Sequence, residues 1–452
     1  MRKKIAEETT IFLSVAKWII ISTCTGAIVG AFTTLFLKLL QWSTTEMSHV
    51  PYYFLLLPVV FLISYVTIKK LAPDAMGHGT EKVIEAIHKN NGKIKVMVVP
   101  VKIFATIITL AVGGSAGKEG PCAQIGAGIS SFLADVFRFD DADRKKIVIC
   151  GISAGFASVF GTPIAGAIFG VEVLVIGSML YEVLLPSFVS GIMAFQVSSK
   201  LGIAYFYHPI SFVPVFTESF FLIIAVAGIF FGLCSFLLIE VLIYTEKFTD
   251  KLTIKKEFQT LIGGSTIVIL AFIFSTKYLG LGLDAIENTL EGGNIEWYAF
   301  LLKILFTSIT LNYGGSGGII TPIFFIGVSA GNLFAKIWGL DPATFSAIGM
   351  VSLLAGAANT PIAASIMSIE LFGPKIAPYA AVSCVISFLM TGHRSVYPSQ
   401  FITSSKIASI QLHSENEIEN LNFTIKRKGV MKVFMDAGKR FSDKRKNKGE
   451  KD

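Results

Sequence analysis

The sequence GGSAGKEGP, at Gly113–Pro121, recurs as GGSGGIITP at Gly314–Pro322, 201 positions further along the chain. The two strings share both leading glycines, the serine, a third glycine two positions after it, and the proline. Both lie within apolar sequence. A hydrophobic chain that interrupts itself twice in the same way indicates two copies of one unit. Only the first copy has a carboxylate, Glu119, and the second has Ile320 at that position.

A second match extends the repeat toward the C-terminus. GTPIAGAIFGVEVL, at Gly161–Leu174, aligns without gaps on NTPIAASIMSIELF, at Asn359–Phe372, with six of 14 positions identical and an offset of 198. The two offsets are nearly equal, so the matches are almost collinear. We therefore divide the membrane region into two repeats, 11–205 and 206–405, and expect the binding site at the interface between them.

The composition is that of an all-α, multi-pass membrane protein. Of the 452 residues 53% are hydrophobic and only 15% are charged, and the mean hydropathy is +0.66. The first apolar run, 11–40, is too long for a signal peptide and is read as a retained helix. Several later runs are shorter than the roughly 20 residues that cross a bilayer. They predict broken, re-entrant or tilted helices around a cavity.

The positive charge lies at the two ends of the chain. The formal net charge is +8, with MRKK at the start and a lysine- and arginine-rich stretch at Lys426–Lys451. Basic flanks favour the cytoplasmic side, so residues 1–10 and 406–452 are expected to be cytoplasmic segments. The tail lacks a nucleic-acid-binding motif and is read as a solvated flank.

Few residues are arranged for catalysis or for holding a cofactor. The five cysteines are widely spaced without a CxxC pair, and the six histidines form no metal-spaced cluster. There is no nucleophile with a neighbouring base. The sequence therefore predicts neither an enzyme nor a bound metal or cofactor.

Four glycine or polar turns precede apolar or amphipathic segments: Gly77–Val83, Gly117–Pro121, Gly317–Pro322 and His393–Pro398. In the last three, a proline is expected at the first helical position, where its missing N–H costs nothing. Free amides and the positive end of a helix dipole make an anion site without a formal cation. Partial charges also release the anion, whereas a full lysine charge would retain it. The alternative, that glycines only allow close helix packing, does not explain the repeated pairing with proline.

Glu119 is the strongest candidate for a functional residue. A carboxylate at a buried anion site acts as a tethered anion, and on protonation it becomes neutral and can leave. It would then be gate and proton acceptor together. The alternative is a surface loop glutamate neutralised by Lys118. A nucleotide-binding loop is excluded, because Val112 replaces the first glycine of that motif and Glu119 stands where a serine or threonine would bind magnesium.

Each of three further polar residues can be interpreted in two ways. Glu172 and Glu370 occupy equivalent positions of the repeat inside apolar segments, which favours either a functional role or a symmetric structural hydrogen bond. Tyr397 stands before a proline in a polar turn, as an interfacial anchor or as a hydroxyl donor to an anion.

At these motifs the chain resembles the CLC family of chloride channels and chloride/proton antiporters, over about residues 11–405. GKEGP resembles its gating-glutamate motif GREGP, GGIITP resembles its GxFxP motif, TPIAGAIFGVE resembles the helix after the gate, and GHRSVYPSQ lies where the family places its anion-coordinating tyrosine. The resemblance implies a homodimer of inverted-repeat subunits, each with its own anion pathway. It implies that Glu119 is the external gate, that Ile319 and Ile320 offer backbone N–H groups, and that Tyr397 offers its hydroxyl.

The chain departs from the family pattern at three places. The motif GSGIP is here GHGTE, so His78 replaces the serine and Thr80 is the alternative hydroxyl donor. The family's antiporters often carry a proton-relaying glutamate directly after the one matching Glu172, where this chain has Val173, as expected for a channel or an unusual proton path. Ile320 replaces a common phenylalanine. The expected anion-binding residues are His78, Gly79, Thr80, Gly117, Lys118, Gly120, Gly318, Ile319, Ile320 and Tyr397.

The predicted function is movement of chloride or a similar small anion across the cell membrane, gated by protonation of Glu119, as a channel or a proton-coupled antiporter. The fluoride-exporting branch of the family also has degenerate first motifs and tends to place a methionine near the first turn and a glutamate near the second. Here Met76 precedes the first turn, but Thr80 and Ile319 occupy the positions that match the methionine and the glutamate. Fluoride/proton exchange is therefore the alternative, and a non-transporting membrane scaffold is a more distant one. The short tail fits a prokaryotic member without regulatory domains.

Overall fold

The computed structural model describes residues 2–210, 218–412, 416–421 and 423–425. The basic stretch Lys426–Lys451 lies outside the described residues. The described part is predominantly helical, as predicted, and the helices divide into two series of eight, one on each side of residues 211–217.

The first series follows the apolar runs of residues 2–200. Its helices are α1 Arg2–Ser48, α2 Leu57–Leu71, α3 Thr80–Lys89, α4 Val98–Ala111, α5 Glu119–Val136, α6 Asp141–Phe160, α7 Pro163–Glu172 and α8 Tyr181–Lys200. The second series is α9 Glu218–Lys251, α10 Lys256–Ile273, α11 Leu283–Leu290, α12 Ala299–Asn312, α13 Ile320–Trp338, α14 Pro342–Ala358, α15 Pro361–Phe372 and α16 Ala377–Met390.

Short elements connect or follow these helices. The 3-10 helices are η1 Tyr53–Leu56, η2 Pro73–Ala75, η3 Thr276–Tyr278, η4 Pro374–Ile376 and η5 Ile418–Asn420. The strands are β1 Val175–Ile176, β2 Phe401–Ile402, β3 Ile410–Leu412, β4 Asn416–Glu417 and β5 Phe423–Ile425.

Two glutamates fix the relative direction of the repeat-equivalent helices α7 and α15. Glu172, the last residue of α7, accepts the amides of Ile362 (3.0 Å) and Ala363 (2.8 Å) at the start of α15. Glu370, near the end of α15, accepts the amides of Ile164 (3.0 Å) and Ala165 (2.8 Å) at the start of α7. Each helix therefore caps the other, and the two run antiparallel, as an inverted repeat requires.

A second reciprocal set of hydrogen bonds joins the repeats next to the glycine strings. The amide of Ser115 donates to the Thr310 hydroxyl (3.0 Å), and the amide of Ser316 donates to the Thr109 hydroxyl (3.1 Å). All four residues are buried. Polar side chains thus replace the backbone partners that are lost where the chain turns at membrane depth.

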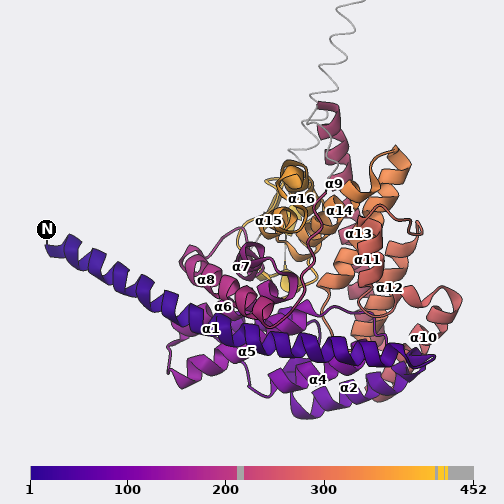
Figure 1. Ribbon diagram of the computed structural model, residues 1–452, viewed down its shortest axis with the longest axis horizontal. Helices are drawn as coiled ribbons and strands as arrows, with labels where there is room; N and C mark the ends of the chain where they lie inside the picture. Colours follow the sequence, from indigo (N-terminus) through magenta and orange to yellow (C-terminus); the bar gives the residue numbers. More distant parts are fainter. Residues whose placement is uncertain (1, 211–217, 413–415, 422, 426–452) are drawn as a thin grey trace, which may run out of the picture.

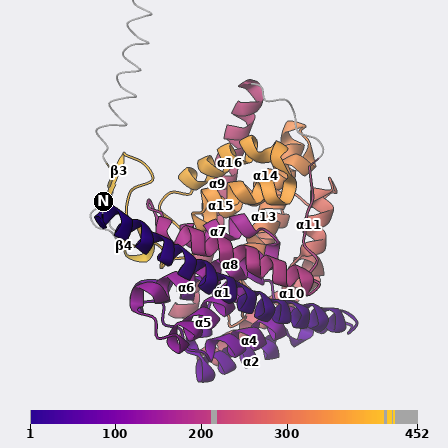
Figure 2. The same cartoon turned by 60° about the vertical axis from the view of Figure 1, so that its left-hand side comes forward.

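Six helices of the described part are long and apolar enough to cross a membrane, and they include α1, α9 and α13. Others, such as α7 and α15 with 10 and 12 residues, are too short to span alone. Figure 1 shows most of the first series (indigo to magenta) at the lower left and most of the second (rose to yellow) at the upper right, with α10 at the lower right. Helix α1 packs along α8 in both views and its N-terminal part projects away from the other helices (Figures 1 and 2).

A small three-stranded sheet, in the order β1-β2-β4, joins the chain after α7 to the chain after α16. Strand β2 pairs in parallel with β1, directly after α7, and antiparallel with β4. Helix α3 is joined to this sheet by the Lys89–Glu417 ion pair (3.2 Å). We call the surface formed by α3, β1, β2 and β4 the tail face.

Two local predictions are wrong. Pro121 and Pro322 are the third residues of α5 and α13, not the first, which the backbone tolerates because none of the first helical amides has an intrahelical partner. After His393–Pro398 no helix begins among the described residues up to 412, and the chain enters β2 instead.

Candidate anion-binding site

Glu119 lies at the centre of the junction between the repeats. It is the first residue of α5 and its side chain is buried, with 1% exposed. Its carboxylate accepts a hydrogen bond from the Thr321 amide (3.1 Å) and another from the Thr321 hydroxyl. Thr321 is the second residue of α13, the equivalent helix of the other repeat. Glu119 is therefore not a surface loop residue, and its charge is held by the N-terminus of a helix.

The two glycine strings meet directly. Gly117 and Gly318 form an antiparallel bridge, in which each amide donates to the carbonyl of the other residue, at 2.7 and 2.6 Å. These two amides are consequently not available to an anion in this structure. The expected donor roles of Gly117 and Gly318 are corrected in this respect: they hold the two turns together.

The amides that follow the bridge have no partner within their own helices. In α5 the first intrahelical bond is donated by Cys122 to Lys118, and in α13 by Ile323 to Ile319. The amides of Gly120 and Ile320 therefore belong to unsatisfied first turns, as do those of the cap residues Lys118 and Ile319. Two helix N-termini thus face each other across one small region, which favours an anion there.

The first turn, GHGTE, packs against the start of α5. Gly79 has φ +82°, a conformation that side chains rarely adopt. A Cβ at Gly79 would collide with the Gly120 carbonyl, and a Cβ at Gly120 would collide with the His78 carbonyl oxygen. Both glycines are therefore required by close backbone contact, and this contact brings the α3 N-terminus to the site.

Unpaired polar atoms gather at this contact. The Thr80 hydroxyl, the Tyr397 hydroxyl and Nδ1 of His78 are buried and have no hydrogen-bond partner among the described residues. Tyr397 is 1% exposed, and its hydroxyl lies beside Thr80. Buried polar groups normally have a hydrogen-bond partner, so three unpaired polar atoms from two segments indicate a place for a polar ligand. The sequence left His78 and Thr80 as alternatives, and the structure places both here.

The segment that carries Tyr397 is fixed by two amide side chains. Gln400 donates to the carbonyls of Val173 and Ala358, both at 2.8 Å. Asn359 donates to the Arg394 carbonyl (2.9 Å) and to Gln400 (2.9 Å). The tyrosine is therefore held at the ends of α7 and α14 by a hydrogen-bond network and is not a free interfacial anchor. Val173 is buried and contributes only its carbonyl.

Sequence reasoning missed two buried lysines. Lys102, in α4, donates to the carbonyls of Ala75 (3.1 Å) and Gly77 (2.7 Å), directly before the GHGTE turn. Lys303, its repeat equivalent in α12, donates to the carbonyls of Tyr278 (3.1 Å) and Gly280 (2.9 Å). Both are 0% exposed. The available signal was a third match between repeats, VKIFATIITL against LKILFTSITL, which aligns the two lysines at the same offset of 201.

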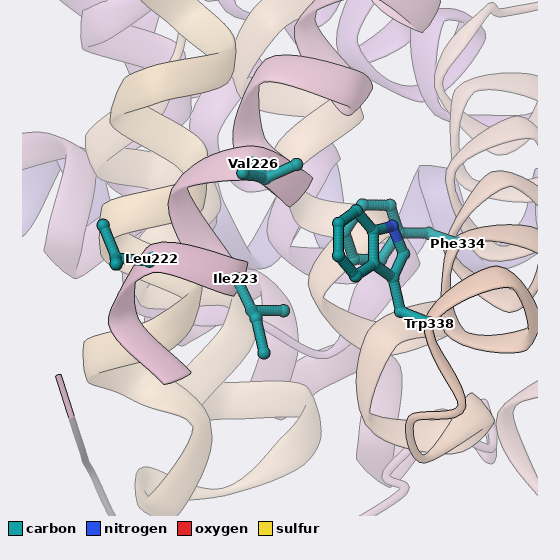
Figure 3. Close-up of a pocket in the computed structure, with 5 residues that line it drawn as sticks. All are labelled: Leu222, Ile223, Val226, Phe334 and Trp338. Carbon is teal, nitrogen blue, oxygen red and sulfur yellow. The ribbon is translucent and has the colours of Figure 1, made fainter. Parts of the chain in front are cut away.

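A pocket of about 230 Å³ opens elsewhere, between α9 and α13 (Figure 3). Its lining side chains are Leu222, Ile223, Val226, Phe334 and Trp338. In the view of Figure 3 the rings of Phe334 and Trp338 face the aliphatic side chains of α9. Such an apolar lining offers no set of donors to an anion. The pocket is therefore separate from the site around Glu119.

The protein-family comparison gives an independent result. A family model described as voltage gated chloride channel matches residues 60–392. A curated relative from Pseudomonas syringae pv. tomato (strain ATCC BAA-871 / DC3000), named chloride/fluoride channel protein, is 36% identical over 411 residues, which cover 88% of this chain and 90% of the relative.

Two solved structures share the fold. A CLC-type fluoride/proton antiporter superposes with a TM-score of 0.82 at 28% identity, covering 86% of this chain and 98% of that one. A slow cyanobacterial Cl⁻/H⁺ antiporter superposes with a TM-score of 0.71 at 20% identity, covering 84% and 94%. The predicted fold class, a helical membrane protein with an inverted repeat, is confirmed.

Proposed function

This chain belongs to the voltage-gated chloride channel (CLC) family, and we propose that each subunit moves a small halide ion across a membrane past Glu119, which acts as the gate. The observation that carries this proposal is the buried carboxylate held by the amide and hydroxyl of Thr321, where the N-termini of α5 and α13 meet. A carboxylate in this position occupies the place that an anion would take. Anion transport is also consistent with what the relatives are named for.

Protonation of Glu119 opens the site. The ionised carboxylate competes with a halide for the two Thr321 donors and for the first-turn amides of Gly120 and Ile320. Once protonated, it is neutral and no longer attracted to the helix N-termini. The halide then takes over these donors and passes between Thr321 and the hydroxyls of Thr80 and Tyr397. Because each contact is a partial charge, the ion leaves again.

Fluoride/proton exchange is the form of transport that the observations favour over chloride transport. One relative is named for chloride and fluoride, and the 28% identical structure is a fluoride/proton antiporter. The site offers hydroxyls of Thr80, Thr321 and Tyr397. Fluoride is smaller than chloride and is hydrated more tightly, so the protein must offer short, strong hydrogen bonds to replace its water. Hydroxyl donors form such hydrogen bonds with an anion.

Halide efflux from reconstituted vesicles tests both statements. Purified protein is placed in liposomes loaded with fluoride or chloride, and efflux is recorded with ion-selective electrodes at two pH values. Wild-type protein is expected to release fluoride faster than chloride. Glu119→Gln, which mimics the protonated carboxyl, is expected to remove the pH dependence of efflux. Unchanged pH dependence in Glu119→Gln would rule out the gate.

The subunits are proposed to pair through the face of α7 and α15. Ile164, Ile362 and Ile369 expose 36%, 48% and 41% of their surface there. Glu370 lies half-buried beside them, within an apolar helix. A carboxylate that faces lipid is costly, and a second copy that covers this face would remove the cost. We further assign residues 11–205 and 206–405 to the two repeats, and both termini to the cytoplasmic side.

A further inference from the structure

Glu81 stands between the anion site and the tail face. It is the second residue of α3 and directly follows Thr80. Its Oε1 accepts hydrogen bonds from the amide (3.0 Å) and the hydroxyl of Ser399, two residues after Tyr397. Its Oε2 is buried and has no partner among the described residues. The carboxylate therefore bridges the two segments that bear the unpaired hydroxyls of Thr80 and Tyr397.

No cation neutralises this carboxylate directly. On the same helix Lys82 pairs with Glu85 (2.7 Å), and Lys89 pairs with Glu85 (3.7 Å) and with Glu417 of β4 (3.2 Å). The Lys82 and Lys89 side chains are thus committed to other carboxylates. Among the described residues Glu81 forms no ion pair.

The remaining titratable neighbours lie on the opposite segment and on the packed helices. Both Glu81 and Glu119 of α5 act electrostatically on Tyr397, which lies on the segment after α16. Burial raises the pKa of Glu81 to about 7, against the opposing effect of the Ser399 hydrogen bonds. A proton is therefore exchanged near neutral pH.

We propose that Glu81 takes up and releases the transported proton at the tail face and exchanges it with Glu119 through the hydroxyls between them. The proposal rests on the proposed halide transport. Val173 offers no proton acceptor, and Glu119 is only 1% exposed, so a proton needs another way in. The Glu81 residue is partly exposed, and hydronium at the tail face transfers a proton to its carboxylate and leaves as water. The Tyr397 and Thr80 hydroxyls each accept one proton and pass on their own, so that one proton reaches the Glu119 carboxylate and Glu81 is ionised again.

The test compares Glu81→Gln with Glu85→Gln in liposomes. Halide efflux and proton uptake are recorded together, and the reversal potential is measured under opposed halide and pH gradients. Glu81→Gln is expected to keep halide efflux within a few-fold of wild type while proton movement falls at least about tenfold, the lower end of what a positioned proton acceptor contributes. Its reversal potential then follows the halide gradient alone. Glu85→Gln, one turn further along α3, is expected to retain coupling.

Several outcomes would overturn the inference. Wild-type coupling in Glu81→Gln refutes it. Wild-type protein that moves halide without protons also refutes it, together with the exchange of fluoride for protons, but leaves halide transport gated by Glu119 intact. Wild-type protein that moves no halide refutes the proposed function itself.

If Glu81→Gln does not fold, a second variant still tests the proposal. Ser399→Ala removes one hydrogen bond to the ionised form of Glu81, which raises the carboxyl pKa. The pH at which proton movement is half-maximal is then expected to shift upward. An unchanged profile would overturn the proposal.

Discussion

At the scale of single residues, Glu119 depends on one partner. Both hydrogen bonds to its carboxylate come from Thr321, one from the amide and one from the hydroxyl. A hydrogen bond to a charged group is worth about 1.5–3 kcal/mol. A change in one hydroxyl should therefore alter how often the gate leaves its site.

Thr321→Val removes the hydroxyl and keeps the amide and the shape of the side chain. The ionised Glu119 then loses one of two bonds, and the closed state is destabilised. Efflux at pH 7.5 relative to efflux at pH 5 is expected to rise by about tenfold, since about 1.4 kcal/mol corresponds to that factor. Thr321→Ser retains the hydroxyl and should resemble wild type. An efflux ratio that is the same in Thr321→Val and Thr321→Ser would contradict the assigned role.

Lys102 places a buried ammonium against the carbonyls of Ala75 and Gly77. Lys102→Met leaves these carbonyls without the lysine donor and removes a positive charge that acts on His78 of the GHGTE turn. The halide concentration for half-maximal efflux is expected to rise several-fold, because a lost hydrogen bond from a charged donor costs about 1.5–3 kcal/mol.

Lys303→Met is the matched control for Lys102→Met. It removes the equivalent ammonium from the carbonyls of Tyr278 and Gly280, which belong to no expected anion turn. Its half-maximal halide concentration should stay near that of wild type, although the protein is destabilised. Equal shifts in both variants would mean that Lys102 acts only through stability.

At the scale of elements, α7 and α15 are joined by two equivalent carboxylates. Glu172 is 8% exposed and Glu370 is half-buried, and each accepts two first-turn amides. Replacement by glutamine removes the charge that complements the helix dipole and one of the two acceptors. We expect each of Glu172→Gln and Glu370→Gln to lower the free energy of unfolding by about 1–2 kcal/mol.

The double variant tests whether the two caps act separately. The ten residues of α7 place them about 15 Å apart, and effects at such distances usually add. Thermal unfolding of purified protein in detergent measures all three variants. A double variant that loses much less stability than the sum would show that the caps form one cooperative unit.

The sequence predicted the elements better than the contacts between them. Apolar runs located the helices, the repeated strings located the junction of the repeats, and the predicted CLC membership is confirmed. The choice for Glu172 between a functional and a structural role could not be made, because its partners lie 190 residues away. Thr321 was missed for the same reason, because it lies 202 residues from Glu119. Lys102 bonds carbonyls only 25 and 27 residues away, and its signal was the third match between the repeats.

The conformation of one polar turn was also not predictable from the sequence. His393–Pro398 has the same polar and proline composition as a helix start, but Gln400 and Asn359 fix it as an irregular segment of bends and a turn that leads to β2. The bonds that decide its conformation are made at the ends of two helices, α7 and α14. Local sequence contains no signal for them.

At the scale of the whole molecule, the function depends on a sequence difference between the two repeats. The equivalent helices α5 and α13 both present free amides, but only α5 begins with a carboxylate, and Thr321 of α13 holds it. Two identical turns would bind an anion without a gate. The difference between Glu119 and Ile320 therefore gives a symmetric scaffold one pathway with one proton-dependent closure.

Pairing of two subunits should depend on the exposed isoleucines of α15. Ile362→Trp and Ile369→Trp place larger side chains on the face beside Glu370, so a closely packed interface there would be forced apart. Overpacking costs about 1–3 kcal/mol per site, and two copies of each site meet in the dimer. The fraction of dimer in lipid is therefore expected to fall at least about tenfold. Ile269→Trp on α10, where the native side chain is 57% exposed, is the control and should remain as dimeric as wild type. Single-molecule photobleaching in liposomes counts the subunits. If the monomeric variants still move halide, each subunit contains a complete pathway, and if all three variants stay dimeric, the α7–α15 face is not the interface.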